Sequence, residues 1–195
     1  MTLVPRRSLL ALSAAASAAV GMPHLARAQS QTTLADTMAG DNRFARFLDV
    51  VTRASAVEEF RQAAPRTVFA PVDGAFLNAP QGLLQDLLGN SGSGNNQNDV
   101  ERVRVMALIQ NHIVPGSFSE TQLAGADRRL RTLNGGDIQL SGTGSGMSVR
   151  NPAPMTQLGA FGAAGAQAAS PARVVGGPIM ASNGMIYPID QIIWP

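Results

Sequence analysis

Apolar residues repeat at helical spacing in the first part of the chain. Four of them lie at i, i+3, i+4 and i+7, the spacing of one face of an amphipathic helix: Phe44, Phe47, Leu48 and Val51. Pro65 ends this pattern, and residues 66–71 then carry the β-branched and aromatic side chains of a strand. Similar spacing predicts helices over 83–88 and 100–110, and a strand with a turn follows at 112–116.

From Arg129 onward the apolar period changes to two. Segments 130–133, 138–140 and 147–150 alternate between apolar and polar residues, and glycine-rich turns separate them. This pattern predicts an antiparallel meander. Two more strand signals, at 173–175 and 179–180, lead toward the end of the sequence.

The stretch from Ala181 to Pro195 needs support from the rest of the chain. Asn183-Gly184 predicts a type I′ hairpin turn, because both central residues of that turn require a positive φ. An isolated hairpin is only marginally stable. We therefore expect the 66–71 strand and the 130–150 meander to pair with it or cover it. Several residues that follow the turn are too apolar for water: Met185, Ile186, Ile189, Ile192, Ile193 and Trp194.

Two segments have the composition of loops. Residues 89–98 are rich in glycine, asparagine and serine without an apolar residue, and residues 151–171 are rich in alanine, glycine and proline. We predict both to be flexible and exposed. Exposed loops often carry binding residues, so both are candidate contact regions.

The first 28 residues have the pattern of an export signal. Arg6 and Arg7 precede an alanine- and leucine-rich run that ends at a small-x-small site, Ala26-Arg27-Ala28. The arginine pair also resembles a twin-arginine signal, so export by this route or by the general route stays open. The run is too short and too rich in alanine for a stable membrane anchor. We expect residues 1–28 to be removed, residues 29–195 to form one domain, and the protein to be periplasmic, secreted or at the cell surface.

Signal removal changes the charge of the protein. All fifteen basic residues are arginine; twelve remain beside thirteen acidic residues, which gives a net charge of −1. This composition does not suggest the basic stripe that nucleic-acid binding requires, so we expect no nucleic-acid partner. The chain has no cysteine, which excludes disulfides and thiolate chemistry.

No sequence motif indicates catalysis or a cofactor. His112 is the only histidine after signal removal and no G-x-S-x-G elbow occurs, which favours a hydrogen-bonded structural histidine over a catalytic one. The aspartates are scattered singly, and the glycine runs match neither phosphate-binding fingerprint. We predict a protein that is not an enzyme, with no metal and no cofactor.

Four segments in a fixed order resemble the fasciclin domain family. Residues 67–76 are similar to its first signature and residues 181–195 to its second; residues 111–116 are similar to its central tyrosine-histidine segment, and residues 130–135 to its threonine-leucine-asparagine-glycine strand. The resemblance covers roughly residues 31–195. It implies an α+β fold, a fasciclin-like wedge with an antiparallel β-sandwich core and several helices packed on one side. It also implies a structural signature: Thr67, Phe69, Pro71, Asp73, Phe76, Asn134, Gly135, Asn183, Gly184 and Asp190.

The resemblance implies an adhesion and interaction module that recognises a protein or glycan partner. Asn111 and His112 are candidate partner-binding residues, because the segment they match is implicated in receptor contact in animal members. Asn111 stands where many relatives carry tyrosine, so integrin-type recognition is not carried over. A second hypothesis is a periplasmic carrier of a small ligand or lipid with an apolar cleft, since the late chain is rich in adaptable methionine and in alanine.

Overall fold

The computed structural model describes residues 32–79, 84, 97–123, 125, 127–143, 146–152 and 170–195. Their helical elements are α1 (Leu34–Ala39), the 3₁₀ helix η1 (Asn42–Phe44), α2 (Ala45–Arg53), α3 (Val57–Arg61), α4 (Asp73–Asn78), α6 (Gln97–Asn111) and α7 (Glu120–Leu123). Their strands are β1 (Arg66–Pro71), β2 (Ile113–Pro115), β3 (Arg128–Arg131), β4 (Asp137–Thr143), β5 (Gly146–Arg150), β6 (Ala172–Arg173), β7 (Ile179–Ala181) and β8 (Gly184–Ile189).

The first sheet has the strand order β2-β1-β8-β7. Strand β8 pairs with β7 in an antiparallel hairpin and with β1 in parallel, from the pair Arg66–Gly184 to the pair Pro71–Ile189. The closing stretch thus pairs with the 66–71 strand, as predicted. The parallel direction of this central pair differs from the antiparallel sandwich expected from the sequence, and it is feasible because a long connection separates β1 from β8.

The second sheet has the order β3-β4-β5-β6 and is antiparallel throughout. Its first three strands are the meander predicted from the period of two. Leu130, Ile138, Leu140 and Val149 are buried, whereas the residues that alternate with them are exposed or half-buried. The alternation confirms that one face of this sheet packs inward and the other faces solvent.

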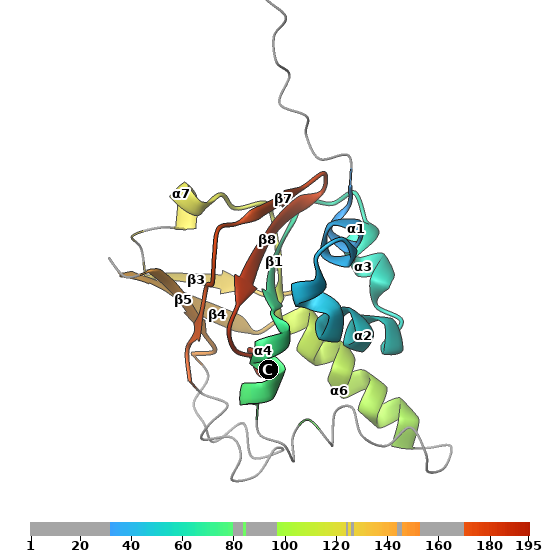
Figure 1. Ribbon diagram of the computed structural model, residues 1–195. Coiled ribbons are helices and arrows are strands. Elements are labelled where there is room, and N and C mark those ends of the chain that lie inside the picture. The colour runs from blue at the N-terminus through green and yellow to red at the C-terminus, as the bar shows by residue number, and fades with distance from the viewer. Residues whose placement is uncertain are drawn as a thin grey trace, which may run out of the picture.

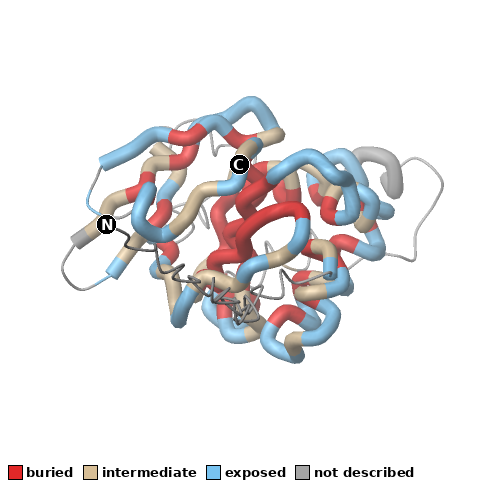
Figure 2. The backbone as a smooth tube through the Cα atoms, turned by 90° about the horizontal axis from the view of Figure 1, so that it is seen from above, coloured by how far each residue is buried: buried red, intermediate tan, exposed pale blue. Residues whose placement is uncertain are grey.

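Figure 1 shows α1, α2, α3 and α6 on one side of β1 and β8, and β3, β4 and β5 on the other. Alternate residues of the central strands serve two cores because they point to opposite faces. Val68 and Ile186 pack with the helices, and Phe69 and Tyr187 pack with the second sheet. In Figure 2 the buried positions gather in the central strands. These layers confirm the predicted α+β wedge with helices on one side.

The predicted helices have the expected apolar faces with shifted bounds. Phe44, Phe47 and Val51 are buried, and Leu48 is half-buried. Helix α6 begins at Gln97, so the end of the predicted 89–98 loop is helical. Most of that loop, the helix predicted at 83–88 apart from Leu84, residues 153–169 and the export signal lie outside the described residues.

The hairpin turn lies one residue earlier than the sequence suggested. Ala181 pairs with Gly184, so Ser182 and Asn183 are the central residues. Ser55 is the only residue other than glycine with a positive φ in the described part of the chain, so Asn183 does not adopt the predicted type I′ conformation. Gly184 is required for a different reason: a Cβ atom at this position would overlap the backbone carbonyl of Arg66. The close approach of β1 and β8 therefore selects glycine.

Candidate functional site

His112 lies in the interior, at the junction of α6 and β2. It is 0% exposed; Nδ1 is 2.7 Å from the Leu108 carbonyl oxygen, and Nε2 accepts a hydrogen bond of 3.0 Å from the Ile193 N–H. These partners fix a neutral ring with the proton on Nδ1. Burial lowers the pKa of His112 from 6.5 to about 4, and the bond to Leu108 opposes this shift. His112 is therefore a neutral structural residue, in line with the sequence-based preference.

Asn111 holds the same C-terminal segment from the neighbouring position. Its Nδ2 donates to the carbonyl oxygens of Ile193 and Trp194 at 3.1 and 3.2 Å, and its Oδ1 accepts from Thr132 Oγ1 at 3.4 Å. Asn111 is 1% exposed. Partner contact by Asn111 and His112 stays a prediction; in this structure both side chains are buried and bonded to the protein's own backbone. The pair attaches Ile193 and Trp194 to the core.

Asn183 joins three segments through its side chain. Oδ1 accepts from the Leu34 N–H at 2.8 Å, and Nδ2 donates to the carbonyl oxygens of Phe60 and Gln62 at 3.0 and 2.7 Å. The start of α1 and the end of α3 are thus attached to the β7–β8 hairpin. Since buried amides must be hydrogen-bonded, asparagine at this position is explained by these contacts rather than by the turn conformation.

Asp73 is the first residue of α4, but its carboxylate does not cap that helix. Its Oδ1 instead accepts from the Arg46 N–H at 2.9 Å, in the first turn of α2, which has no side-chain cap from its own Phe44. The carboxylate therefore caps α2 across a gap of 27 residues in sequence. Asp190 connects two segments in a similar way, because Oδ1 accepts from the Arg173 N–H at 2.7 Å.

The remaining signature residues lie in β1, in α4 and in the turn between β3 and β4. Thr67 is buried; its Oγ1 donates to the Gly116 carbonyl oxygen at 2.8 Å and accepts from the Phe118 N–H at 2.9 Å. Phe69 stacks on Tyr187 with ring centroids 5.6 Å apart. Pro71 and Phe76 are buried near the end of β1 and in α4, and Asn134 and Gly135 lie in the exposed β3–β4 turn.

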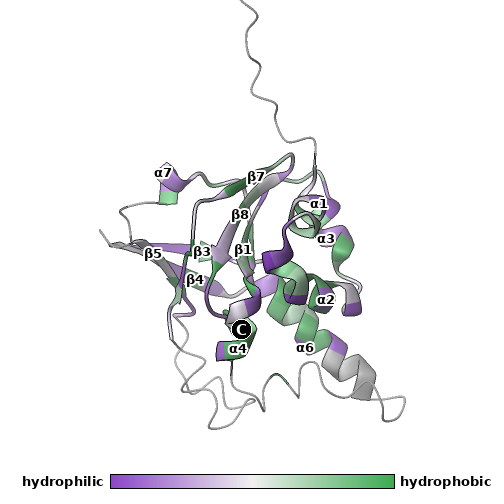
Figure 3. Cartoon of the chain, in the orientation of Figure 1, coloured by the Kyte–Doolittle hydropathy of each residue, from purple (hydrophilic) through white to green (hydrophobic). Residues whose placement is uncertain are grey.

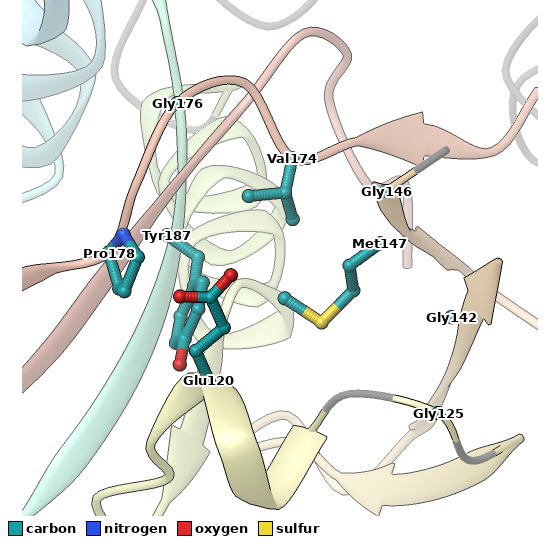
Figure 4. Close-up of a pocket in the computed structure, with 9 residues that line it drawn as sticks. All are labelled: Glu120, Gly125, Gly142, Gly146, Met147, Val174, Gly176, Pro178 and Tyr187. Atoms are coloured by element: carbon teal, nitrogen blue, oxygen red, sulfur yellow. The ribbon is translucent and has the colours of Figure 1, made fainter. Parts of the chain in front are cut away.

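A pocket of about 240 Å³ lies between the hairpin side of the first sheet and the end of the second. Met147, Val174, Pro178 and Tyr187 provide apolar walls, and the Met147 side chain extends toward Glu120 and Tyr187 (Figure 4). Burial, together with the negative charge of Glu120, raises the pKa of Tyr187 to about 12, and its hydroxyl donates to the Phe118 carbonyl oxygen at 2.9 Å. The phenol therefore remains protonated at neutral pH.

The pocket is small and mostly apolar, with one carboxylate at its rim. Ligand pockets commonly enclose about 300–1,000 Å³, so this one suits only a small apolar group. Its lining comes from separate segments after residue 119. The methionine content of the late chain pointed toward an adaptable pocket, but no sequence signal identified these residues together.

Two other kinds of site are not found in the described part of the chain. No group of three or more histidine, cysteine, aspartate or glutamate side chains is placed to hold a metal ion. None of the described helices combines the length and the apolar character needed to cross a membrane.

Comparison with known proteins assigns the fold and the signature segments to one family. The fasciclin domain model matches residues 42–195, about four fifths of the sequence. The chain belongs to the fasciclin domain family. This fasciclin domain is 26% identical to Protein sll1483 of Synechocystis over 203 residues, which cover 96% of each chain. It is 30% identical to the uncharacterized protein sll1735 of the same organism over 78% of this chain and 90% of that one.

Some relatives are longer than this chain and match it over only part of their length. The match to transforming growth factor-beta-induced protein ig-h3 of Oryctolagus cuniculus is 28% identical and covers 84% of this chain but 19% of that protein. Among solved structures, a FAS1 domain pair from the insect cell adhesion molecule fasciclin I aligns with a TM-score of 0.53 over 79% of this chain and 46% of that chain. At 13% identity this likeness shows the fold.

Proposed function

We propose that this fasciclin domain is an exported, non-enzymatic interaction module that recognises a protein or glycan partner in the periplasm or at the cell surface. The observation that carries the proposal is the family match over residues 42–195. The solved relative belongs to a cell adhesion molecule, which agrees with a binding role. Exposed loops often carry binding residues, so we expect recognition to occur at the surface.

The geometry of His112 supports a non-enzymatic role. A general base must reach the proton that it removes, and both ring nitrogens of His112 are already bonded to backbone groups in the core. A hydrolase activity that is abolished in His112→Ala with the fold intact would contradict this assignment.

Export is part of the proposal, and the signal pattern of residues 1–28 supports it. Thr32 is the first described residue, and its carbonyl oxygen accepts from the Ser182 N–H at 2.9 Å. We expect the intact mass of the protein from its host envelope to correspond to residues 29–195; a mass that retains residues 1–28 would argue against removal of the signal.

Binding to the envelope tests the proposed function. We expect the fluorescently labelled protein to bind isolated envelopes of its host saturably, and unlabelled protein to displace it. Heat-unfolded protein serves as the control. Binding that does not saturate, or that is equal for the unfolded protein, would contradict the proposal. Shortening 89–98 and 151–171 together tests the predicted contact loops, because unchanged binding would remove them from the interaction surface.

The pocket beside Tyr187 favours a second candidate function, that of a small-ligand carrier. Its apolar walls suit a small hydrophobic group, although its volume of about 240 Å³ is too small for a whole lipid. Native mass spectrometry of the protein from its own host tests this function. A small molecule that co-purifies, and that is lost when Met147→Trp fills the pocket, would support the carrier; the bare polypeptide mass supports the interaction module.

A further inference from the structure

The second sheet gathers arginines on its solvent-facing side. Arg129 and Arg150 both pair with Gln139, one from each neighbouring strand, and Arg173 pairs with Ser148. These arginines alternate with the buried residues of their strands and are exposed, as is Arg131. Figure 3 shows hydrophilic colours along β3 and β4. We define the arginine face as Arg129, Arg131, Arg150 and Arg173.

The arginine face differs from four arginines elsewhere in the molecule, each of which is paired with an acidic residue. These four ion pairs are Arg43–Asp41, Arg53–Asp49, Arg61–Glu58 and Arg66–Glu59. Within the described residues, no ion pair joins an arginine of the arginine face to an acid.

Three acidic residues lie near the arginine face, and within the described residues none of them forms an ion pair with it. Asp137 is the register partner of Arg131, Asp127 accepts from Ser141 Oγ at 2.7 Å, and Asp190 accepts from the Arg173 N–H. Among the arginines, Arg150 donates to the neutral Gln139 Oε1 at 2.9 Å. The guanidinium groups therefore remain available to an anionic ligand.

The spacing of the arginine face suits a polymer with repeated anionic groups. Arg129 and Arg150 are two strands apart, about 10 Å, and Arg129 and Arg131 are two residues apart, about 7 Å. Between the cations lie the amide of Gln139 and the hydroxyls of Ser141 and Ser148, all half-buried. Carboxylates match guanidinium groups in pairs of hydrogen bonds, and sugar hydroxyls match amides and hydroxyls.

We propose that the arginine face binds an acidic polysaccharide that carries uronate carboxylates. This proposal rests on the proposed interaction function and narrows it to one class of partner. The large exposed apolar side chains of the described residues are Leu77, Val103 and Met180, and none belongs to the second sheet. A face without apolar anchors suits a hydrated glycan better than a membrane surface.

Polygalacturonate is the test ligand, and neutral dextran is its control. Two double variants are compared with the wild type by titration calorimetry at low salt. R129Q/R150Q removes two charges from the arginine face. R102Q/R104Q removes two exposed charges from α6 and has the same net charge, so it controls for non-specific attraction.

We expect polygalacturonate to bind the wild type, with affinity that falls as sodium chloride is added, and dextran not to bind. Each exposed ion pair contributes up to about fivefold in affinity, so R129Q/R150Q should bind about 3- to 25-fold more weakly. R102Q/R104Q should remain within about twofold of the wild type. If R129Q/R150Q does not keep the wild-type melting temperature, R173Q on the short strand β6 replaces it.

Equal losses in the two double variants would overturn the proposal, because net charge alone would explain them. Absence of polygalacturonate binding would also overturn it, as would preferred binding to phosphatidylglycerol vesicles or to a DNA duplex. Unchanged envelope binding by R129Q/R150Q would reject the arginine face while leaving the interaction module in place. Absence of saturable envelope binding by the wild type would reject the proposed interaction function itself.

Discussion

Acidification should destabilise this domain through His112. The unfolded imidazole has a pKa of 6.5 and the folded one a pKa of about 4, because the folded ring is fully buried; the bond from Nδ1 to the Leu108 carbonyl oxygen opposes this lowering only in part. Well above pH 6.5 the ring is neutral in both states, so its titration does not change the free energy of unfolding. As the pH falls below 6.5, the unfolded state takes up a proton that the folded state does not, so stability decreases until about pH 4.

The size of this loss follows from the two pKa values. Each pH unit between them is worth about 1.4 kcal/mol, which gives about 2 kcal/mol at pH 5 and about 3 kcal/mol at pH 4. The ring is 0% exposed, so solvent screening does not reduce these values greatly. This loss is a large fraction of the 5–15 kcal/mol that typically stabilises a domain.

The assay is urea unfolding of the wild type and His112→Gln from pH 7 to pH 4.5. Glutamine carries a donor and an acceptor but does not titrate in this range. The unfolding free energy of His112→Gln should therefore fall less steeply with decreasing pH than that of the wild type, and the difference in slope should correspond to the uptake of up to one proton per molecule. Carboxylate titration is common to both proteins and cancels. Parallel stability–pH curves would refute the reasoning. If His112→Gln does not fold, the imidazole shifts of the wild type in NMR should stay constant down to pH 5, and titration near pH 6.5 would have the same refuting force.

Three substitutions test the structural contacts. Gly184→Ala should destabilise the domain by about 3 kcal/mol or more in urea unfolding, because its Cβ has no room beside Arg66; wild-type stability would show that β1 and β8 are farther apart. Asp73→Ala should cost about 1 kcal/mol and speed hydrogen exchange at the Arg46 amide, and unchanged exchange there would refute the capping of α2. Asn183→Ala should cost about 2–4 kcal/mol because buried polar groups lose their partners, whereas Asn134→Ala in an exposed turn should cost little; equal effects would contradict the role of Asn183.

Much of the strand and helix pattern could be predicted because the periodic apolar signals agree with the fold. The period of two at 130–150 produced a real meander, and the apolar face around Phe47 packs on the central sheet. The direction of the β1–β8 pair could not be obtained in this way. A strand signal has no direction, and only the arrangement of the distant segments determines it.

Side-chain partners that are distant in sequence were beyond sequence reasoning. Asp73 is the first residue of α4, yet its carboxylate accepts a hydrogen bond from the Arg46 N–H in α2. Asn183 suggested a turn residue, although its amide meets Phe60 and Gln62. Asn111 and His112 matched a segment with receptor contacts, and the sequence did not indicate that both side chains are buried.

The arginine face was within reach of the sequence, yet it was missed. In a meander, a buried Leu130 places its neighbours Arg129 and Arg131 outward, and a buried Val149 does the same for Arg150. The net charge of the whole chain is near zero and does not reveal this cluster of arginines, because it sums over surfaces that the fold separates.

Envelope binding by two variants of equal stability tests most directly whether recognition occurs at the surface. Met147→Trp fills the pocket beside Tyr187, and R129Q/R150Q removes two charges from the arginine face. We predict that Met147→Trp binds host envelopes as well as the wild type and that R129Q/R150Q binds at least about threefold more weakly. Loss of binding in Met147→Trp together with unchanged binding in R129Q/R150Q would contradict surface recognition and favour the carrier.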